Sequence, residues 1–560
     1  MSEQKVGLIV REVKQACVAL SYLQRHSIVE KLKTNHYDLL IVGGGITGAG
    51  IALDASARGL KTALVEKSDF AFGTSSRSTK LIHGGLRYLK QLEFGLVKEV
   101  GSERAVVHQL APHLVVPEKM LLPLHEKRGF GSLLTSFGLK LYDFLAGVKP
   151  EDQRKMLTRN QTLHQEPLLR KDDVKGGAIY AEYRTDDARL TIEIIKSAAQ
   201  HGAEVLNYCR VLRFLYQEGK VVGATVREEI SGEEFEIKSR SVVNAAGPWV
   251  DELRQLDGSK QGKHLHLTKG VHLVVAKEKL PVKQAIYFDV EEDGRMIFAI
   301  PRGRTTYIGT TDTNYNGNKE EVHATSEDVA YLLRAINQTF PGVNITNADI
   351  ESSWAGLRPL INEEGKSASE LSRKDEIFEA PSGLLSIAGG KLTGYRKMAE
   401  RVLDQLIGRT FSNRELSDCA THKITLYGSD FKNYNEVKQF IASITARLKS
   451  RQLPDGYANY LVGNYGKQTE LILNDLQAGE ADVELAKAEM RFTLQHEMVC
   501  NPLDFFVRRT GMLYFDKPRM RSVLEAVLFE FKVKMNWGDE QVTTERSIVD
   551  KALAGVIDFQ

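Results

Sequence analysis

The sequence predicts an α/β fold in which a parallel sheet is joined to an antiparallel sheet and to a C-terminal helical region. Three observations lead to this prediction. Between residues 37 and 65, a buried strand, a glycine-rich turn, a helix and a second buried strand follow one another. Residues 264–312 contain short strands of alternating polarity, and residues 411–560 are rich in helical patterns. A chain of 560 residues is too long for a single hydrophobic core, so we expect several domains.

The first strand, residues 37–42, is a short run of apolar and β-branched residues, as expected for a buried parallel strand. A glycine-rich turn follows it and leads into a helix over residues 46–58. Gly43 permits the tight turn, Gly45 lets the backbone approach a pyrophosphate, and Gly48 lets the helix pack closely on the strand. The predicted dinucleotide cradle is completed by Gly44, Ile46 and Thr47.

Glu66 directly follows the second strand of this unit, residues 61–65. An acidic side chain at this place accepts hydrogen bonds from the adenosine ribose of a bound dinucleotide. The helix N-terminus directs free N–H groups and its positive dipole end toward the pyrophosphate. Strand, glycines, helix, second strand and acid occur in register, which an ordinary turn does not explain. Nicotinamide and flavin adenine dinucleotides both fit this pattern.

The overall composition is that of an ordinary globular protein. The net charge of +2 and the absence of a long basic run argue against nucleic-acid binding. Four widely spaced cysteines show no metal-ligand spacing, so we predict reduced thiols and no metal site. No run of 18 apolar residues and no secretory signal is found, which favours a cytoplasmic location.

Residues 1–36 are predicted to form an N-terminal helical extension. Apolar residues recur there at helical spacing, namely Ile9, Val13, Cys17, Leu20 and Leu23. Lysine and arginine outnumber glutamate in this segment, so the helix could lie on an anionic membrane surface. A helix that packs on its own protein or on a partner has the same pattern, and we favour this interpretation.

A loop that is dense in hydroxyl and basic side chains follows Glu66. Its candidate ligands for phosphate and for the edges of a flavin are Thr74, Ser75, Ser76, Ser78, Thr79, Lys80 and Leu81. The glycine-rich turn after this loop brings His83, Arg87 and Tyr88 together. Arg87 could bind a small anion through two parallel hydrogen bonds. His83 could be a base or a structural histidine, and the residues alone leave both open.

These motifs resemble those of the FAD-dependent glycerol-3-phosphate dehydrogenases, within the glutathione-reductase and D-amino-acid-oxidase group of flavoproteins. The resemblance rests on residues 43–50, 74–88, 183–190, 243–250, 308–312, 354–360 and 388–396. It is strong over residues 37–410 and looser beyond them.

The resemblance implies a division of the chain. The FAD-binding domain would consist of residues 37–90, 180–255 and 350–410. Residues 91–179 and 256–349 would form a substrate or cap domain with an antiparallel sheet. Residues 411–560 would form a C-terminal helical domain whose role stays open.

The resemblance also implies further contacts with FAD. These are Val211 near the adenine, Ala246 and Gly247 at the end of a strand, and Gly390, Lys391, Leu392 and Thr393 at another glycine turn. In this family that turn begins a helix that faces the flavin pyrimidine ring. Lys391 would add positive charge where reduction leaves negative charge.

The implied reaction is oxidation of the C2 hydroxyl of sn-glycerol 3-phosphate to dihydroxyacetone phosphate, with a hydride passing to flavin N5. Arg87, Arg358 and Lys391 would hold the phosphate or polarise the C2 oxygen. Tyr88 and Lys269 would complete the substrate site. His83 and His272 are both candidate bases, because an imidazole titrates near neutral pH. A role for Arg358 in proton removal also stays open.

Members of this family pass electrons to membrane quinone or, in an oxidase branch, to dioxygen. Oxidase relatives carry an insertion after the motif that contains Arg358, whereas this chain has only a short loop over residues 361–371. This favours a quinone-dependent dehydrogenase at the inner face of the cytoplasmic membrane, with a homodimer as one possible assembly. The alternatives are an amino-acid or sarcosine-type oxidase of the same fold, and a non-catalytic dinucleotide-binding or tRNA-modification protein.

Overall fold

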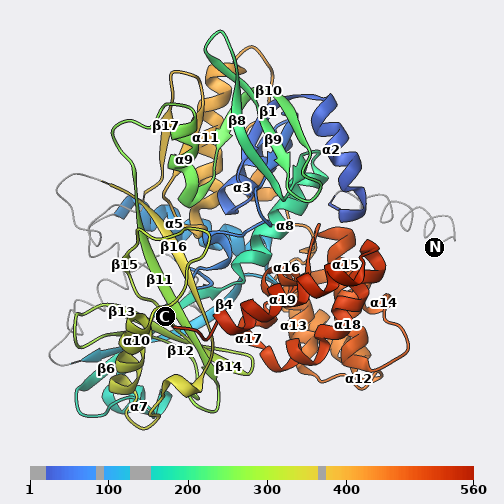
Figure 1. The fold of residues 1–560 in the computed structure, drawn as a ribbon. Helices are drawn as coiled ribbons and strands as arrows, with labels where there is room; N and C mark the ends of the chain where they lie inside the picture. The colour runs from blue at the N-terminus through green and yellow to red at the C-terminus, as the bar shows by residue number, and fades with distance from the viewer. Residues whose placement is uncertain (1–19, 84–93, 126–152, 363–373, 560) are drawn as a thin grey trace.

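The computed structural model describes residues 20–83, 94–125, 153–362 and 374–559. A parallel sheet with its helices occupies one end of the molecule, and a second sheet occupies the other end (Figure 1). The C-terminal helices lie beside both sheets. This arrangement confirms the predicted α/β architecture.

Within the described ranges, the first sheet has eight strands, six of which follow the order β17-β18-β10-β1-β2-β7. The neighbours from β18 to β7 are parallel, whereas β17 and the β8–β9–β10 meander add antiparallel pairs. Its strands are β1 (His36–Val42), β2 (Thr62–Val65), β7 (Glu204–Leu206), β8 (Cys209–Gln217), β9 (Lys220–Glu228), β10 (Glu234–Asn244), β17 (Glu376–Glu379) and β18 (Leu385–Ala388).

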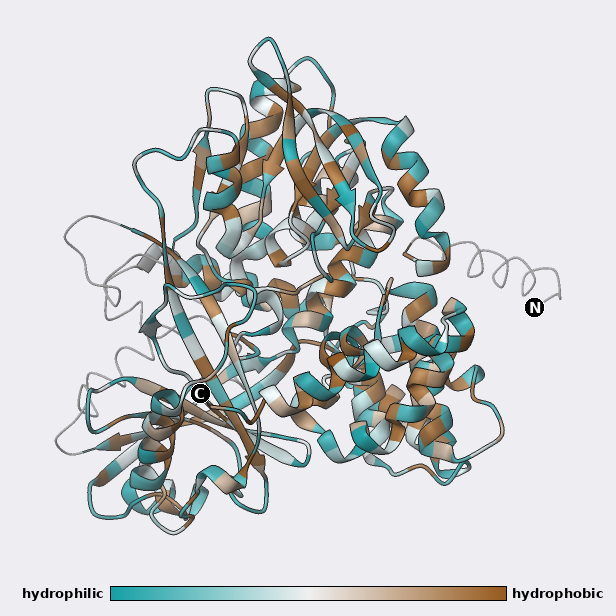
Figure 2. Ribbon diagram, in the orientation of Figure 1, coloured by the Kyte–Doolittle hydropathy of each residue, from teal (hydrophilic) through white to brown (hydrophobic). Residues whose placement is uncertain are grey.

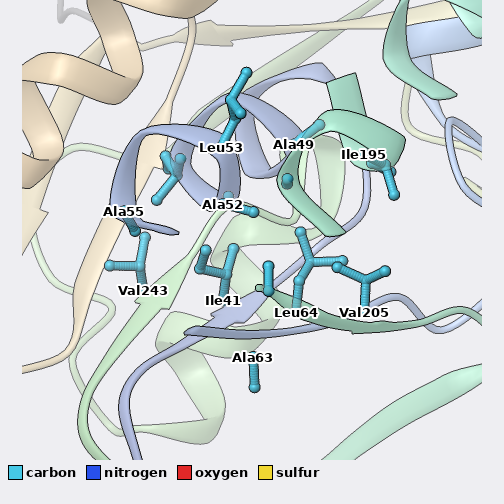
Figure 3. Packing of buried hydrophobic residues seen from close by; sticks show 14 of the residues in the cluster. Ile41, Ala49, Ala52, Leu53, Ala55, Ala63, Leu64, Ile195, Val205 and Val243 are labelled. Carbon is cyan, nitrogen blue, oxygen red and sulfur yellow. The ribbon is translucent and has the colours of Figure 1, made fainter. Parts of the chain in front are cut away.

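Helix α3 (Ile46–Ala57) packs on this sheet and contacts α8 (Asp187–Gln200) and α11 (Tyr395–Thr410). Figure 3 shows Ala49, Ala52 and Leu53 of α3 above the strand residues Ile41 and Leu64. Small alanine side chains let the helix axis approach the sheet closely, and all five of these residues are buried. The sheet and the beginning of α3 therefore form one rigid unit that positions the glycine turn.

The second sheet has ten strands in the order β15-β11-β14-β13-β12-β4-β6-β3, with β16 beside β11 and β5 beside β6. It is antiparallel except for the pair β4–β12. Its strands are β3 (Leu81–Ile82), β4 (Val116–His125), β5 (Lys155–Thr158), β6 (Val174–Arg184), β11 (Leu265–Ala276), β12 (Ala285–Asp289), β13 (Met296–Arg302), β14 (Thr305–Gly309), β15 (Thr313–Asn314) and β16 (Ile350–Ile361).

Two segments that we expected in the FAD-binding domain belong to this second sheet by hydrogen bonding. Residues 180–184 end β6, which pairs with β4, and residues 350–361 form β16, which pairs with β11 along its length. The expected boundaries followed the motifs, but each motif stands where the chain passes from one sheet to the other. The motif residues can therefore contact the first domain while their backbone pairs in the second sheet.

The two faces of β11 have different neighbours. Val271, Leu273 and Val275 pack against helix α10 (Ser326–Thr339) in one apolar cluster. On the other face, Val274 belongs to a cluster that includes the C-terminal helices. This alternation follows from the two-residue period of a strand.

The C-terminal region is helical, as predicted. Its elements are α12 (Tyr434–Lys449), α13 (Gly456–Tyr465), α14 (Thr469–Asn474), α15 (Ala481–His496), α16 (Pro502–Asp504), the π-helix η9 (Phe505–Arg509), α17 (Met512–Phe515), α18 (Lys517–Met535) and α19 (Asp539–Gly555). Hydrophobic and polar residues alternate along these helices (Figure 2). Other helices of the described chain are α2 (Arg25–Thr34), α5 (Phe94–Leu110), α7 (Arg159–Gln165) and α9 (Val250–Leu256).

Within the described part of the N-terminal segment, helix α2 packs on its own protein. Ile28, Val29 and Leu32 are buried in the same cluster as the first sheet. Leu20 is also buried there, but Leu23 is 60% exposed. The expected apolar stripe was therefore wrong at Leu23, because the chain forms the short 3-10 turn η1 (Tyr22–Gln24) at this point. Residues 1–19 lie outside the described residues.

Candidate functional site

The glycine turn between β1 and α3 has the close contacts that its sequence predicts. Gly43 has a φ of +116°, a backbone conformation that residues with a Cβ atom rarely adopt. A Cβ atom at Gly43 would lie 2.6 Å from the Ala245 carbonyl oxygen. At Gly48 it would lie 1.9 Å from the Gly43 carbonyl oxygen, so the first turn of α3 rests directly on the glycine turn. Both positions require glycine.

Glu66 stands at the end of β2, directly beside this turn. Its Oε2 accepts a hydrogen bond from the Gly44 N–H at 2.7 Å, and its Oε1 accepts one from the Ser68 N–H at 3.0 Å. Burial raises the pKa of the Glu66 carboxyl above its ordinary value. The Ser75 hydroxyl oxygen accepts a hydrogen bond from the Ile46 N–H at 2.9 Å, so the hydroxyl-rich loop contacts the N-terminus of α3.

The hydroxyl-rich loop lies between the glycine turn and the second sheet. It begins with the 3-10 turn η2 (Thr74–Ser76), and the Thr74 hydroxyl donates to the Leu357 carbonyl oxygen on β16. The Ser76 hydroxyl is buried and has no hydrogen-bond partner among the described residues. A buried hydroxyl without a hydrogen-bond partner in the protein is suited to bind a polar ligand.

Lys80 is buried at the end of the loop and forms an ion pair with Asp187, at 2.5 Å from Nζ to Oδ1. The other oxygen of Asp187 accepts a hydrogen bond from the Ser78 N–H at 2.9 Å. Asp187, the first residue of α8, thus fixes the position of the loop. Trp354 also holds the loop, because its indole N–H donates to the Ser78 carbonyl oxygen.

Three cross-strand pairs of β11 and β16 form the face of the second sheet that meets this loop. They are His272 with Trp354, Gly270 with Gly356, and Thr268 with Arg358. The His272 ring stacks on the Trp354 indole, with 4.6 Å between centroids and 10° between planes. Its Nε2 lies 3.0 Å from the Thr79 hydroxyl. The loop and the sheet are therefore joined at His272.

The charge state of His272 follows from its surroundings. The ring is buried, and Arg358 and Lys80 are the nearby cations. Burial first, and then these two positive charges, lower the pKa of His272 well below its ordinary value. The imidazole is therefore neutral at neutral pH. The same positive field favours an anionic ligand at this face.

The guanidinium of Arg358 lies over Gly270, where a Cβ atom would be only 2.2 Å from Nη2. Nη1 donates to the Thr311 carbonyl oxygen at 3.1 Å and to Asp312 Oδ1 at 3.0 Å. Nη2 donates to the Thr310 hydroxyl at 2.9 Å. A long and flexible side chain is thereby held in one orientation.

Another glycine turn, formed by Gly389 and Gly390, follows β18 and leads through η6 (Leu392–Gly394) into α11. Gly390 has a φ of +77°, and a Cβ atom there would lie 2.4 Å from the Met398 sulfur. Lys391 is the residue before η6. The Thr393 hydroxyl is 3.4 Å from the His83 carbonyl oxygen, so this turn lies next to His83, whose ring contacts Phe298 of β13.

Two further predicted contacts stand beside the first glycine turn. The Ala245 N–H donates to the Val42 carbonyl oxygen at 2.8 Å, which places Ala246 and Gly247 at the carboxyl end of β1. Strand β8, which contains Val211, begins at Cys209, whose N–H donates to the Glu66 carbonyl oxygen at 2.7 Å. The segments predicted around the adenosine thus meet at one edge of the sheet.

Comparison with known proteins identifies the family. Residues 38–396 match the family of FAD-dependent oxidoreductases, and residues 419–542 match the C-terminal domain of alpha-glycerophosphate oxidase. The aerobic glycerol-3-phosphate dehydrogenase of Bacillus subtilis is 48% identical over 535 residues, which cover 94% of this chain and 96% of the relative. That of Staphylococcus saprophyticus is 52% identical over 518 residues, which cover 91% and 93%.

A solved structure is also similar over nearly the whole length. The X-ray structure of the glycerol-3-phosphate dehydrogenase from Bacillus halodurans, complexed with FAD, superposes with a TM-score of 0.82 at 42% identity. The match covers 96% of this chain and 98% of that chain. The chain belongs to the FAD-dependent glycerol-3-phosphate dehydrogenase family.

Among the described residues, several of those predicted to hold FAD have a geometry that fits the cofactor. Gly43 and Gly48 have contacts that only glycine permits, which keep the first turn tight, and Glu66 stands at the end of β2, where the ribose of FAD is expected. The partnerless Ser76 hydroxyl lies in the loop predicted to contact FAD. The cofactor is FAD. No helix in the described ranges combines the length and apolar character needed to cross a bilayer.

Lys269 is a substrate-site candidate that the structure does not bring to the face with His272 and Arg358. It alternates with Gly270 and His272 along β11, so its side chain lies on the opposite face of the sheet. There Nζ forms an ion pair with Asp328 of α10 at 2.6 Å. We expected Lys269 to bind substrate because it is close to His272 in the sequence. Its position on the opposite face of β11 contradicts this expectation. Arg87 and Tyr88 lie outside the described residues.

Four residues of the site were not assigned a role from the sequence. Thr310 and Asp312 fix Arg358, Trp354 supports His272, and Asp187 holds the loop through Lys80 and Ser78. All four lie in motifs that carried the family resemblance, which was a usable signal, since Asp187 falls within residues 183–190. Asp187 stands in the first turn of α8, where an acidic residue is sufficiently explained by the helix dipole.

Proposed function

We propose that this protein oxidises sn-glycerol 3-phosphate to dihydroxyacetone phosphate. The observation that supports this substrate most directly is Arg358, which is held by the 310–312 segment on the same face as the neutral His272. A guanidinium held in one orientation can donate two parallel hydrogen bonds to a phosphate. An uncharged amine substrate would gain no binding energy from this group. The relatives' names agree with this substrate.

When bound, FAD would supply the acceptor for the hydride of C2, and the protein's own residues bind the substrate and remove the hydroxyl proton. Arg358 and Lys391, together with Arg87, hold the phosphate or polarise the C2 oxygen. A base takes the proton of the C2 hydroxyl as the carbonyl forms. His83 and His272 remain the two candidates, and the lowered pKa of His272 keeps its ring unprotonated and able to accept a proton.

The first experiment is an anaerobic titration of the purified protein with glycerol 3-phosphate, followed by the visible absorbance of the flavin. We expect the oxidised-flavin band to bleach with one equivalent of substrate. Glycerol and sarcosine serve as controls, because glycerol lacks the phosphate and sarcosine is the substrate type of the alternative oxidase. Bleaching by sarcosine, but not by glycerol 3-phosphate, would discard the proposed substrate and retain the fold.

We propose further that the electrons pass to a membrane quinone and that the protein binds the inner face of the cytoplasmic membrane as a peripheral protein. The assembly as a homodimer is a separate proposal. Vesicles that contain a quinone should accept electrons from the substrate-reduced protein faster than dioxygen does. Sedimentation with anionic vesicles tests the membrane contact. Equal rates with and without quinone, or a protein that never sediments, would contradict these proposals.

A further inference from the structure

The segment between β2 and the hydroxyl-rich loop forms a tight support for the first glycine turn. Glu66 accepts the Gly44 N–H, and the Ala71 N–H donates back to the Gly44 carbonyl oxygen at 3.0 Å. The Phe70 ring is fully buried, and a Cβ atom at Gly44 would lie 2.8 Å from it. The position of residues 66–71 therefore determines where Glu66 and Gly44 stand.

Asp69 lies in the middle of this segment and is fully buried. Its partners come mainly from the C-terminal domain. Arg508 Nε donates to Oδ2 at 2.5 Å, and Arg509 donates to Oδ2 from Nη1 at 2.7 Å and to Oδ1 from Nη2 at 2.9 Å. Asn207, from the segment before β8, donates to Oδ1 at 3.1 Å. The two arginines lower the pKa of Asp69 to about 2, so the carboxylate is charged.

The two arginines are adjacent in sequence, which is unusual for a shared ligand. Neighbouring residues of an α-helix point about 100° apart, given 3.6 residues per turn. Here residues 505–509 form a π-helix, and the Thr510 N–H donates to the Phe505 carbonyl oxygen five residues earlier. Such single π-helical turns are rare and occur frequently at functional sites. Both guanidinium groups of this turn reach the same carboxylate.

Arg509 is itself fixed from the opposite side. Its Nη2 also donates to the Glu497 carbonyl oxygen at 2.8 Å, and Glu497 pairs with Arg189 of α8 at 2.5 Å. Asp69, Glu497, Arg189 and Arg509 are all fully buried. The network thus joins the C-terminal domain to two elements of the first domain without contact with solvent, so water cannot replace a missing partner.

We propose that Arg508 and Arg509 are positioning residues for FAD. They hold Asp69, and through the 66–71 segment they keep Glu66 and Gly44 in the geometry that binds the adenosine end of the cofactor. The C-terminal helical domain is therefore a component of the FAD site, although it contributes no residue to the glycine turns. This inference rests on the family's FAD binding and is independent of the substrate.

The test is the dissociation constant of FAD, measured by quenching of flavin fluorescence on titration into the full-length apoprotein. The variant Arg509→Gln should raise the dissociation constant at least tenfold, and Arg509→Lys should raise it less because it retains the charge. Once saturated with FAD, Arg509→Gln should keep a KM for glycerol 3-phosphate within about twofold of wild type. This combination would not arise from a general loss of structure.

Arg519→Gln is the matched control. Arg519 is also a buried arginine of the C-terminal domain, but it pairs with Asp482 and Glu489 of the same domain. We expect Arg519→Gln to lower the thermal midpoint while the FAD dissociation constant stays within about twofold. An unchanged FAD affinity in Arg509→Gln would overturn the proposal. Equal loss of affinity in Arg519→Gln would also overturn it, because the effect would then be domain stability alone.

Asp69→Asn repeats the test from the other side of the contact and guards against misfolding of the arginine variant. The amide keeps the shape and one acceptor oxygen but loses the charge that pairs with both arginines. We expect a rise of at least fivefold in the FAD dissociation constant. Wild-type affinity in Asp69→Asn would show that this contact does not position the cofactor.

Discussion

The substitution Gly270→Ala tests the fixed orientation of Arg358 without removal of any polar group. Gly270 is buried in β11, its backbone has no positive φ, and alanine is therefore acceptable to the strand itself. The new Cβ would lie 2.2 Å from Arg358 Nη2, 2.6 Å from Cζ and 2.6 Å from the Thr310 hydroxyl oxygen. The guanidinium must move, because the backbone of a central strand cannot.

The size of the effect follows from this displacement. Non-bonded heavy atoms need about 3.5 Å, so the guanidinium must shift by roughly 1 Å. Such a shift breaks the good geometry of the hydrogen bonds to Thr310 and Asp312. A misplacement of about 1 Å can cost on the order of 100-fold in rate, or about 2.7 kcal/mol of transition-state stabilisation. We expect kcat/KM for glycerol 3-phosphate to fall by that order.

The assay is steady-state reduction of an artificial electron acceptor, with the FAD content of each preparation determined from its visible absorbance. Gly342→Ala is the control for a glycine-to-alanine change without a clash, because Gly342 lies in the exposed loop after α10 and a Cβ there meets nothing within 4 Å. If Gly270→Ala retains full FAD and its kcat/KM stays within threefold of wild type, the assigned role of Arg358 is wrong.

Two other perturbations follow from buried charges. Asp187→Asn removes the nearer of the two carboxylates that pair with the buried Lys80, Asp187 and Asp186, and should lower the unfolding free energy by about 3 kcal/mol, visible as a lower thermal midpoint; an unchanged midpoint would contradict it. Burial, then Arg189 and Lys196, lower the pKa of His113 from 6.5 to about 3. Below pH 6.5, His113 therefore binds a proton in the unfolded chain but not in the folded protein. The unfolding free energy consequently falls as the pH decreases from 6.5 toward 3. At pH 5 this costs about 2 kcal/mol, which His113→Gln should abolish, as thermal unfolding at pH 5 and pH 7.5 would show; equal pH dependence in both proteins would refute it.

Local sequence was sufficient wherever the function depends on backbone geometry. The glycines at positions 43 and 48 were assigned from their spacing alone, and the structure gives each a contact that only glycine permits. The position of Glu66 was predicted from the end of its strand, because a short-range sequence pattern is sufficient to show where a parallel strand ends. The antiparallel sheet followed from two-residue alternation, which also determines the face on which each residue lies.

The same alternation could have corrected Lys269. Gly270 and His272 share a parity that Lys269 does not, so only one set can face the loop. What the sequence could not provide is the register between strands. The pairs His272–Trp354 and Thr268–Arg358 join residues that are more than 80 positions apart, and no local pattern specifies them. The Asp69 contact with Arg508 and Arg509 spans an even longer separation and depends on a π-helical turn.

The low pKa of His272 provides a way to decide whether it is the base. In the free protein, burial and the charges of Arg358 and Lys80 disfavour the imidazolium. A bound dianionic phosphate would offset that positive field and raise the pKa of His272, so the ring becomes a stronger base when substrate is present. The acid limb of kcat reports the substrate complex, and that of kcat/KM reports the free enzyme. If His272 is the base, the limb of kcat lies at higher pH than the limb of kcat/KM, and both limbs move to higher pH in Lys80→Met, which removes one of the charges that lower the pKa of His272. Coincident limbs would exclude His272 and leave His83, which lies near Phe298 and Thr393, as the remaining candidate.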